Sequence, residues 1–128
     1  MSLLADLTAQ VLAFRDERDW AQFHSLRNLI VSLNLEASEL LELTQWKNDT
    51  EMEMAALASN AEAHAALCDE CADVLIYLLL IAEHAGIDLE QAARAKLTKN
   101  AAKYPVEHSY GSSRKYSHRQ VADDPPQP

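Results

Sequence analysis

Residues 71–82 read Cys-Ala-Asp-Val-Leu-Ile-Tyr-Leu-Leu-Leu-Ile-Ala, and Asp73 is the one charged residue among these twelve. A helix that is apolar nearly all round is normally buried on all sides. A chain of 128 residues has difficulty covering such a helix by itself. We therefore predict a helical core and a homo-oligomer that completes its cover. The longest unbroken apolar run, residues 74–82, is far shorter than the roughly 20 residues that span a bilayer. No membrane partner is expected.

The composition favours an all-α fold. Leucine and alanine fill 19 and 21 positions, whereas valine, isoleucine and threonine together fill 13. This balance favours helix over a sizeable sheet. Gly86 and Gly111 are the two glycines in the sequence. Phosphate-binding P-loops, dinucleotide-binding GxGxxG turns and GxSxG nucleophile elbows are therefore excluded, because each needs several glycines in one short loop.

Apolar periodicity and boundary residues predict four helices joined by short connections, the pattern of an antiparallel four-helix bundle. Ser59 with Glu62, and Asp88 with Gln91, have the spacing of helix-starting capping boxes, and Gly86 is suited to end a helix. Residues 47–58 are predicted to be a polar connection with a short turn. The helices are expected over about residues 3–18, 26–46, 59–85 and 89–104.

Charge divides the chain unevenly. The net charge of −9 makes a nucleic acid polymer an unexpected partner for the whole surface. Residues 1–95 carry 17 acids and 5 bases, whereas residues 96–119 carry 6 bases and 1 acid. We predict a helical domain over residues 1–110 and a tail over residues 111–128, basic at first and disordered at its end. No basic stretch opens the chain, so we expect a cytoplasmic protein without a signal peptide.

Two cysteines, Cys68 and Cys71, lie one helical turn apart. No strand precedes them, as it would in a redox CxxC motif, and two further zinc ligands are not evident. We expect both thiols to be buried on one face of a helix, because free cysteine is among the most buried residue types.

Two pairs of acids lie at i, i+3 spacing on helices predicted to be in the core. The first pair is Glu36 and Glu39, and Glu36 lies at the edge of an apolar stripe. The second pair is Glu70 and Asp73, which lie in the most apolar helix. Such pairs can face each other across a bundle, where they would repel without a cation. Oxygen ligands suit Mg²⁺ or Mn²⁺, and iron is disfavoured because no histidine follows a glutamate by three residues. The alternative is that these acids form a solvated face of the helix. For Glu42, the next acid along the chain, the two interpretations are equally good.

A basic segment and a set of aromatic residues accompany the acids. Lys96, Asn100 and Lys103 share one helix face, and Arg114 and Lys115 follow in the tail. These groups suit phosphates that a metal recruits, although Lys103 also complements a helix dipole. Flat rings beside such a site could stack on a nucleobase, and plain core packing is the alternative, which we expect for Phe14. The aromatic and imidazole candidates are Trp20, Phe23, His24, Trp46 and Tyr77.

Several segments resemble the MazG-like all-α nucleotide pyrophosphohydrolases, and in particular their dCTP pyrophosphatase branch. The resemblance covers roughly residues 14–117. One departure is Val11, where that branch often has a histidine. The segments are Arg18-Asp-Trp-Ala-Gln-Phe-His24, Arg27-Asn-Leu29, Glu36-x-x-Glu39-Leu-x-Glu42-Leu-x-Gln-Trp46, Glu70-x-x-Asp73-Val-Leu-Ile-Tyr77, Lys96-x-x-x-Asn100-x-x-x-Tyr104-Pro105 and Gly111-Ser-x-Arg-Lys-Tyr116.

The resemblance implies a Mg²⁺-dependent enzyme that cleaves a nucleoside triphosphate between its α and β phosphates, with dCTP or a modified dCTP as the expected substrate. It implies a homotetramer built as a dimer of dimers. Carried over residue by residue, it makes Glu36, Glu39, Glu70 and Asp73 the metal ligands and the catalytic carboxylates. It assigns substrate contacts to Trp20, His24, Trp46, Tyr77, Lys96, Asn100, Arg114 and Lys115. The alternatives are a non-catalytic helical oligomer that binds a nucleotide or a partner, and a purely structural bundle.

Overall fold

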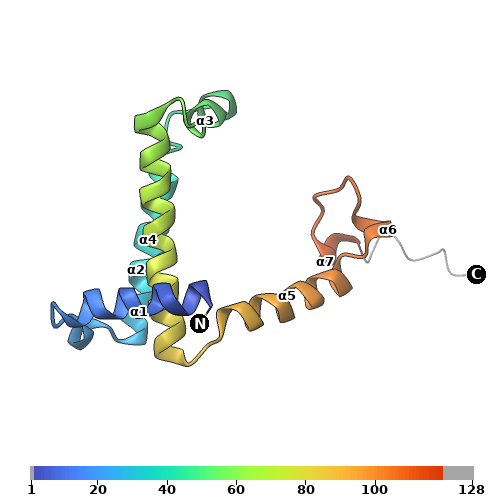
Figure 1. Cartoon of the computed structure of the whole chain (residues 1–128). Helices are drawn as coiled ribbons and strands as arrows, with labels where there is room; N and C mark the ends of the chain where they lie inside the picture. Colours follow the sequence, from blue (N-terminus) through green and yellow to red (C-terminus); the bar gives the residue numbers. More distant parts are fainter. Residues whose placement is uncertain (1, 120–128) are drawn as a thin grey trace, which may run out of the picture. The chain divides into compact units, whose positions relative to one another are not determined.

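The computed structural model describes residues 2–119, and this part of the chain is helical with no strand. The all-α prediction is therefore confirmed. None of its helices is both long and apolar enough to cross a bilayer. In chain order the helices are α1 (Leu3–Asp16), the 3₁₀ turn η1 (Ala21–Phe23), α2 (Leu26–Glu42), α3 (Asp49–Ala55), α4 (Ala61–Ala85), α5 (Leu89–Lys103), α6 (Val106–Ser109) and α7 (Tyr116–Arg119) (Figure 1).

Local capping chemistry explains several of these boundaries. The Asp88 side chain accepts a hydrogen bond from the backbone N–H of Gln91 at 3.0 Å, which confirms the cap predicted at the start of α5. Gly86 ends α4 in the left-handed conformation with φ of 66°, as predicted. The Ile87 N–H then donates to the Ala82 carbonyl at 2.8 Å and closes the last turn of α4. Each of these bonds satisfies a helix-end group that has no partner within its helix.

Other predicted boundaries are wrong. The Ser59 cap does not form, because Asn60 is the residue before α4 and makes no side-chain capping bond. Helix α2 ends at Glu42 and not at Trp46, since residues 43–46 turn and Trp46 has a φ of 65°. Helix α1 ends at Asp16 and not at Arg18, since the following turn brings Asp19 to a φ of 53°. A short helix, α3, replaces most of the predicted polar connection, and the Asn48 side chain caps it.

Residues up to Ile87 form one compact unit, and residues from Asp88 form a second. In the first unit α2 and α4 run antiparallel along each other, and α1 packs across α4 (Figure 1). The buried residues of these helices are Leu29 on α2 and Leu79, Leu80 and Ala82 on α4. Because α5 lies in the second unit, the four-helix bundle stays a prediction, as does the domain boundary at residue 110.

One face of α4 stays uncovered in the single chain. Leu75 and Leu78 are 37% and 36% exposed, and both cysteines are exposed. The burial predicted for Cys68 and Cys71 is therefore wrong for the single chain. The physical reason is their spacing, since residues 68, 71, 75 and 78 share the face of α4 that α1 and α2 leave open.

Candidate functional site

Four carboxylates converge between α2 and α4. Glu36 and Glu39 lie one turn apart on α2, and Glu70 and Asp73 lie one turn apart on α4. Since the two helices run antiparallel, the pairs meet, and one oxygen from each residue lies within 4.8 Å of the others. The structure thus brings together the two acidic pairs as their helical spacing predicts. Glu42 is exposed and lies outside this group.

The carboxylate cluster, as we call Glu36, Glu39, Glu70 and Asp73, has no compensating cation among the residues that the structure describes. No lysine or arginine of residues 2–119 forms an ion pair with any of the four. Burial, reinforced by the neighbouring Glu39, raises the pKa of Glu36 to about 7. The same two causes raise the pKa of Glu70. The fold therefore holds Glu36 and Glu70 where their charged forms are disfavoured.

The donor set of the cluster fits a hard divalent cation. One oxygen of Glu36 and one of Glu70 are buried and have no hydrogen-bond partner among the described residues. Unsatisfied buried oxygens are uncommon in folded proteins and call for a partner such as an ion or a water. All four ligands are oxygens, which is the set that Mg²⁺ and Mn²⁺ prefer over softer metals. The residues present could therefore hold a metal.

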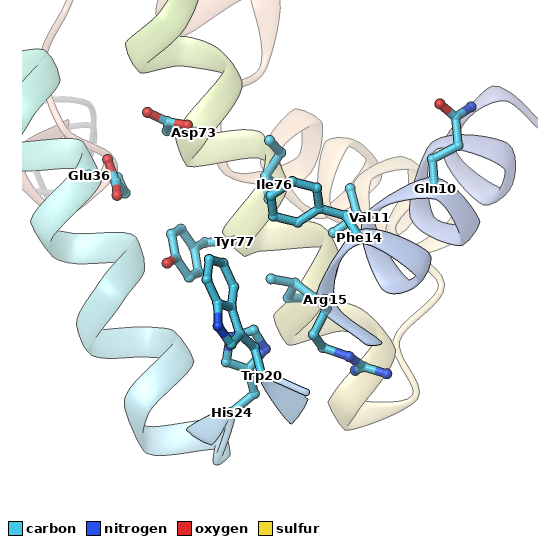
Figure 2. Close-up of a pocket in the computed structure, with 11 residues that line it drawn as sticks. Gln10, Val11, Phe14, Arg15, Trp20, His24, Glu36, Asp73, Ile76 and Tyr77 are labelled. Atoms are coloured by element: carbon cyan, nitrogen blue, oxygen red, sulfur yellow. The ribbon is translucent and has the colours of Figure 1, made fainter. Parts of the chain in front are cut away.

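A cavity of about 380 Å³ adjoins the cluster, and Glu36 and Asp73 line it directly. Figure 2 shows Trp20, His24 and Tyr77 gathered on its wall, with side chains of α1 beside them. The cavity joins an acidic edge to an aromatic wall, so it can accept a ligand with one charged part and one flat part. The complete lining is Gln10, Val11, Phe14, Arg15, Trp20, His24, Glu36, Asp73, Ile76, Tyr77 and Leu80.

His24 contributes a neutral polar group to the cavity wall. Burial, and next the charge of Arg15, lowers the pKa of this imidazole below its ordinary value of 6.5. At neutral pH the ring therefore carries one N–H donor and one acceptor nitrogen. Its Nδ1 atom is buried and has no partner among the residues that the structure describes. A ligand with a polar edge could satisfy it.

The structure gathers some of the predicted substrate residues and not others. Trp20, His24 and Tyr77 line the cavity together with Glu36 and Asp73. Trp46 is 92% exposed in the single chain and does not line it. The remaining candidates belong to the second unit and stay predictions. They are Lys96, Asn100, Arg114 and Lys115.

Sequence reasoning missed the contribution of α1. Phe14 was expected in the core, yet it is 52% exposed and lines the cavity with Val11 and Arg15. The spacing of these three residues, i, i+3 and i+4, is a signal that they share one helix face. That face could have been found from the sequence, but what it packs against could not.

Comparison with known proteins extends these observations. Residues 31–118 match the model of the MazG-like family. The chain is 45% identical to mouse dCTP pyrophosphatase 1 over 114 residues, which cover 89% of this chain and 66% of the mouse protein. It is 40% identical to human dCTP pyrophosphatase 1 over 124 residues, which cover 94% of this chain and 72% of the human protein. The chain thus spans 66% of the length of the mouse relative.

A solved structure is similar as well. The crystal structure of a pyrophosphatase from Archaeoglobus fulgidus superposes with a TM-score of 0.73 at 36% sequence identity. The match covers 82% of this chain and 94% of the archaeal chain. The matched residues include most of α2, all of α4 and α5, and all four acids of the carboxylate cluster. By sequence and by fold, this chain belongs to the MazG-like family.

Proposed function

We propose that this chain is a metal-dependent nucleoside triphosphate pyrophosphohydrolase, with dCTP or a modified dCTP as its substrate. The observation that carries the proposal is the convergence of four carboxylate oxygens within 4.8 Å beside a cavity with an aromatic wall. In the reaction, water breaks the P–O bridge between the α and β phosphates. The products are a nucleoside monophosphate and pyrophosphate, with release of a proton. The names of the mouse and human relatives support this assignment.

The proposed metal ligands and catalytic carboxylates are Glu36, Glu39, Glu70 and Asp73. Mg²⁺ is the proposed cofactor, with Mn²⁺ as a substitute, because all four ligands are hard oxygens. Such a cation supplies Lewis acidity toward phosphate oxygens and water. The carboxylates position it, and one of them orients the attacking water. The weakly polar interior between α2 and α4 strengthens these electrostatic interactions relative to water.

The cavity wall is the proposed base and sugar site. Trp20 and Tyr77 offer flat rings for stacking, and the neutral His24 offers hydrogen bonds to a polar edge. We assign phosphate contacts to Lys96, Asn100, Arg114 and Lys115, whose charge or polarity suits that role. Trp46 is assigned to the base site as well, and since it does not line the cavity of its own chain, we propose that it contributes to a site completed by a neighbouring subunit.

We further propose that the chain assembles as a homotetramer, a dimer of dimers. Large apolar side chains on α2 and α4 are exposed in the single chain, which is unusual for a monomer and typical of a subunit surface. They include Leu35, Leu41, Leu75 and Leu78. We place the enzyme in the cytoplasm, with residues 1–110 as its catalytic domain and residues 111–128 as a tail. Neither a membrane nor a nucleic acid polymer is a proposed partner.

The deciding experiment measures pyrophosphate release from a panel of ribo- and deoxyribonucleoside triphosphates, with Mg²⁺ and with a chelator. Metal-dependent release that is fastest with dCTP supports the proposal in full. Release that is fastest with another nucleotide retains the chemistry and points to the cavity lining, Val11 first. Orthophosphate in place of pyrophosphate means that a different bond is cleaved. Nucleotide binding without any product favours the alternative, a non-catalytic binding oligomer.

A further inference from the structure

The turn between α1 and α2 contains polar residues that the proposed reaction leaves without a role. These polar residues are Arg18, Asp19 and Gln22. They lie in the same short segment as Trp20 and His24, the two residues of this turn that line the cavity. The turn has no apolar core of its own, since none of its residues is fully buried. Its conformation must therefore come from polar contacts and from the aromatic rings themselves.

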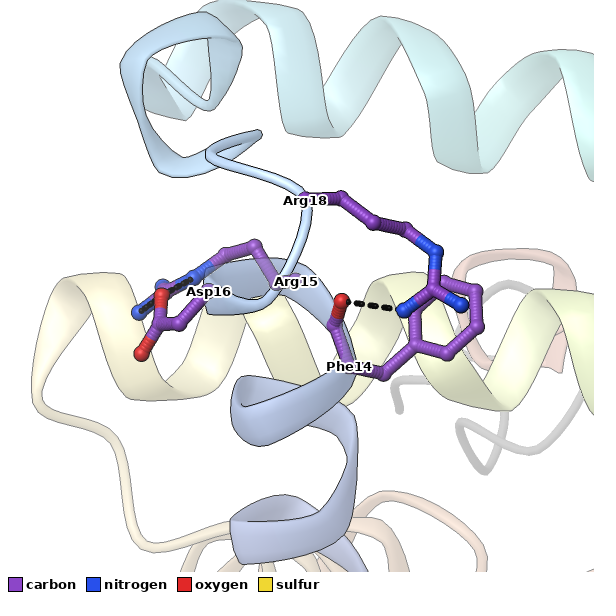
Figure 3. A network of polar contacts seen from close by, with 4 residues as sticks. All are labelled: Phe14, Arg15, Asp16 and Arg18. Carbon is purple, nitrogen blue, oxygen red and sulfur yellow. Dashed lines mark hydrogen bonds and ion pairs between the residues drawn. The ribbon is translucent and has the colours of Figure 1, made fainter.

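Arg18 contacts three parts of this region at once, and its Nη1 atom also lies 3.6 Å from a carboxylate oxygen of the exposed Glu17. Its Nη1 atom donates a hydrogen bond to the Phe14 carbonyl oxygen at 2.9 Å, as Figure 3 shows. Its guanidinium carbon lies 3.6 Å from the centroid of the Phe14 ring and 6.0 Å from that of Trp20. The two rings meet edge to face with their centroids 5.8 Å apart. Arg18 thus connects the end of α1 to both aromatic residues on this side of the cavity.

The backbone of the turn is held independently. The Trp20 N–H donates to the Arg15 carbonyl at 3.1 Å, and Asp19 adopts the left-handed conformation. The Gln22 side-chain amide donates to both the carbonyl and the carboxylate of Asp19, each at 2.9 Å. These bonds place the Cα of Trp20, but they do not select the orientation of its ring.

We propose that Arg18 is a positioning residue for nucleotide binding, which fixes the rings of Phe14 and Trp20 as one wall of the cavity. Trp20 is 45% exposed and Phe14 is 52% exposed, so core packing alone does not hold either ring. A planar guanidinium can stack on a ring and bond a carbonyl together, whereas a lysine ammonium cannot stack in that way. Arg18 does not line the cavity, so it acts through the two rings. This inference rests on the proposed function for its kinetic consequence only.

The kinetic test compares R18A, R18K and the control R27A, which removes another exposed arginine from the start of α2. Substrate is varied in the pyrophosphate-release assay at saturating Mg²⁺. For R18A we expect KM to rise roughly five- to tenfold with kcat within about twofold, as expected for the loss of one stacked cation at a partly exposed site. R18K should fail to restore KM, and R27A should match the original chain. Equal KM values for R18A and R27A would overturn the proposal.

A second measurement does not depend on catalysis. In a W46F background Trp20 is the single tryptophan, so its fluorescence reports on this wall of the cavity alone. Adding R18A should increase acrylamide quenching of Trp20 about twofold and lower its anisotropy, because the ring is then free to move. R27A in the same background should change neither. If the chain releases no pyrophosphate at all, the proposed function fails. The quenching measurement then still decides whether Arg18 positions Trp20. Unchanged quenching in R18A would overturn the proposal. A fall in kcat together with a fall in the melting temperature would also overturn it, because both would show that Arg18 only stabilises the fold.

Discussion

Replacing Glu36 with glutamine should change the stability of the protein in opposite directions with and without metal. In the metal-free protein, the four carboxylates offer oxygens within 4.8 Å of one another and have no cationic partner among the described residues. Two unit charges at that distance repel by about 1 kcal/mol in water and by about 3.5 kcal/mol at an effective dielectric constant of 20. Glutamine at position 36 keeps the shape of the side chain and removes this repulsion.

The net gain in the free energy of unfolding is smaller than the summed repulsion between Glu36 and its three neighbouring carboxylates. Solvent screens the cluster, and the raised pKa of about 7 leaves Glu36 partly protonated near neutrality. At pH 8 we therefore expect E36Q to stabilise the metal-free protein by about 1–3 kcal/mol. For a unit of this size, each kcal/mol raises the melting temperature by about 4–8 °C. The melting temperature of E36Q in chelator should thus exceed that of the original chain by at least about 4 °C.

Mg²⁺ should reverse the order of the two melting temperatures, so that the original chain becomes more stable than E36Q. A ligand at a hundred times its Kd stabilises the folded state by about 2.7 kcal/mol. E36Q replaces one of the four carboxylate ligands with a neutral amide, which binds Mg²⁺ more weakly. Circular dichroism melts at pH 8, in chelator and in Mg²⁺, check both signs. E42Q is the matched control, because Glu42 lies on the same helix outside the cluster and should respond to Mg²⁺ as the original chain does. Identical melts of E36Q and the original chain in both conditions would refute a metal-binding cluster and leave a solvated acidic face.

Three further outcomes follow from the same geometry. D73N should lower pyrophosphate release at least a hundredfold while it leaves the circular dichroism spectrum unchanged, and release within tenfold of the original rate would contradict its role. In chelator, the melting temperature of the original chain should fall as pH rises from about 5 to 8, because the folded state keeps a proton on Glu36 up to a pKa of about 7 while the unfolded chain loses it near 4.5. That slope should flatten in E36Q, and an equal slope would contradict the assignment. L78E should dissociate the oligomer in sedimentation velocity, since it places a charge on the exposed apolar face of α4, and an unchanged sedimentation coefficient would exclude that face from the interface.

The two acidic pairs of the carboxylate cluster were predictable because the geometry within each pair is local. Residues three apart on a helix share a face in any tertiary context, so Glu36 with Glu39 and Glu70 with Asp73 had to form pairs. The apolar surroundings of Asp73 then indicated burial, and the two helices had to meet along their apolar faces. The caps at Asp88 and Gly86 were predictable for the same reason, since they depend on residues within one turn.

The features that sequence reasoning missed depend on which face another element covers. Cys68 and Cys71 were predicted to be buried from their residue type, but α1 and α2 cover a different side of α4. Phe14 has the pattern of a core residue, yet it ends beside a cavity. The Ser59 cap had the right spacing, yet the residue that precedes α4 is Asn60, one position later. Residue type and spacing do not contain this information, because it arises from long-range packing.

Two different kinds of interaction hold the two halves of the candidate site. The carboxylates are on long helices whose register is fixed by buried side chains, among them Leu29, Leu79 and Leu80. The aromatic wall lies on a short turn that polar contacts fix, with Arg18 between Phe14 and Trp20. Changes in the turn should therefore alter nucleotide affinity with little effect on the metal, whereas changes in the cluster should alter metal binding and turnover. This separation allows the cavity wall to vary, and with it the preferred base, while the chemistry of the cluster stays the same.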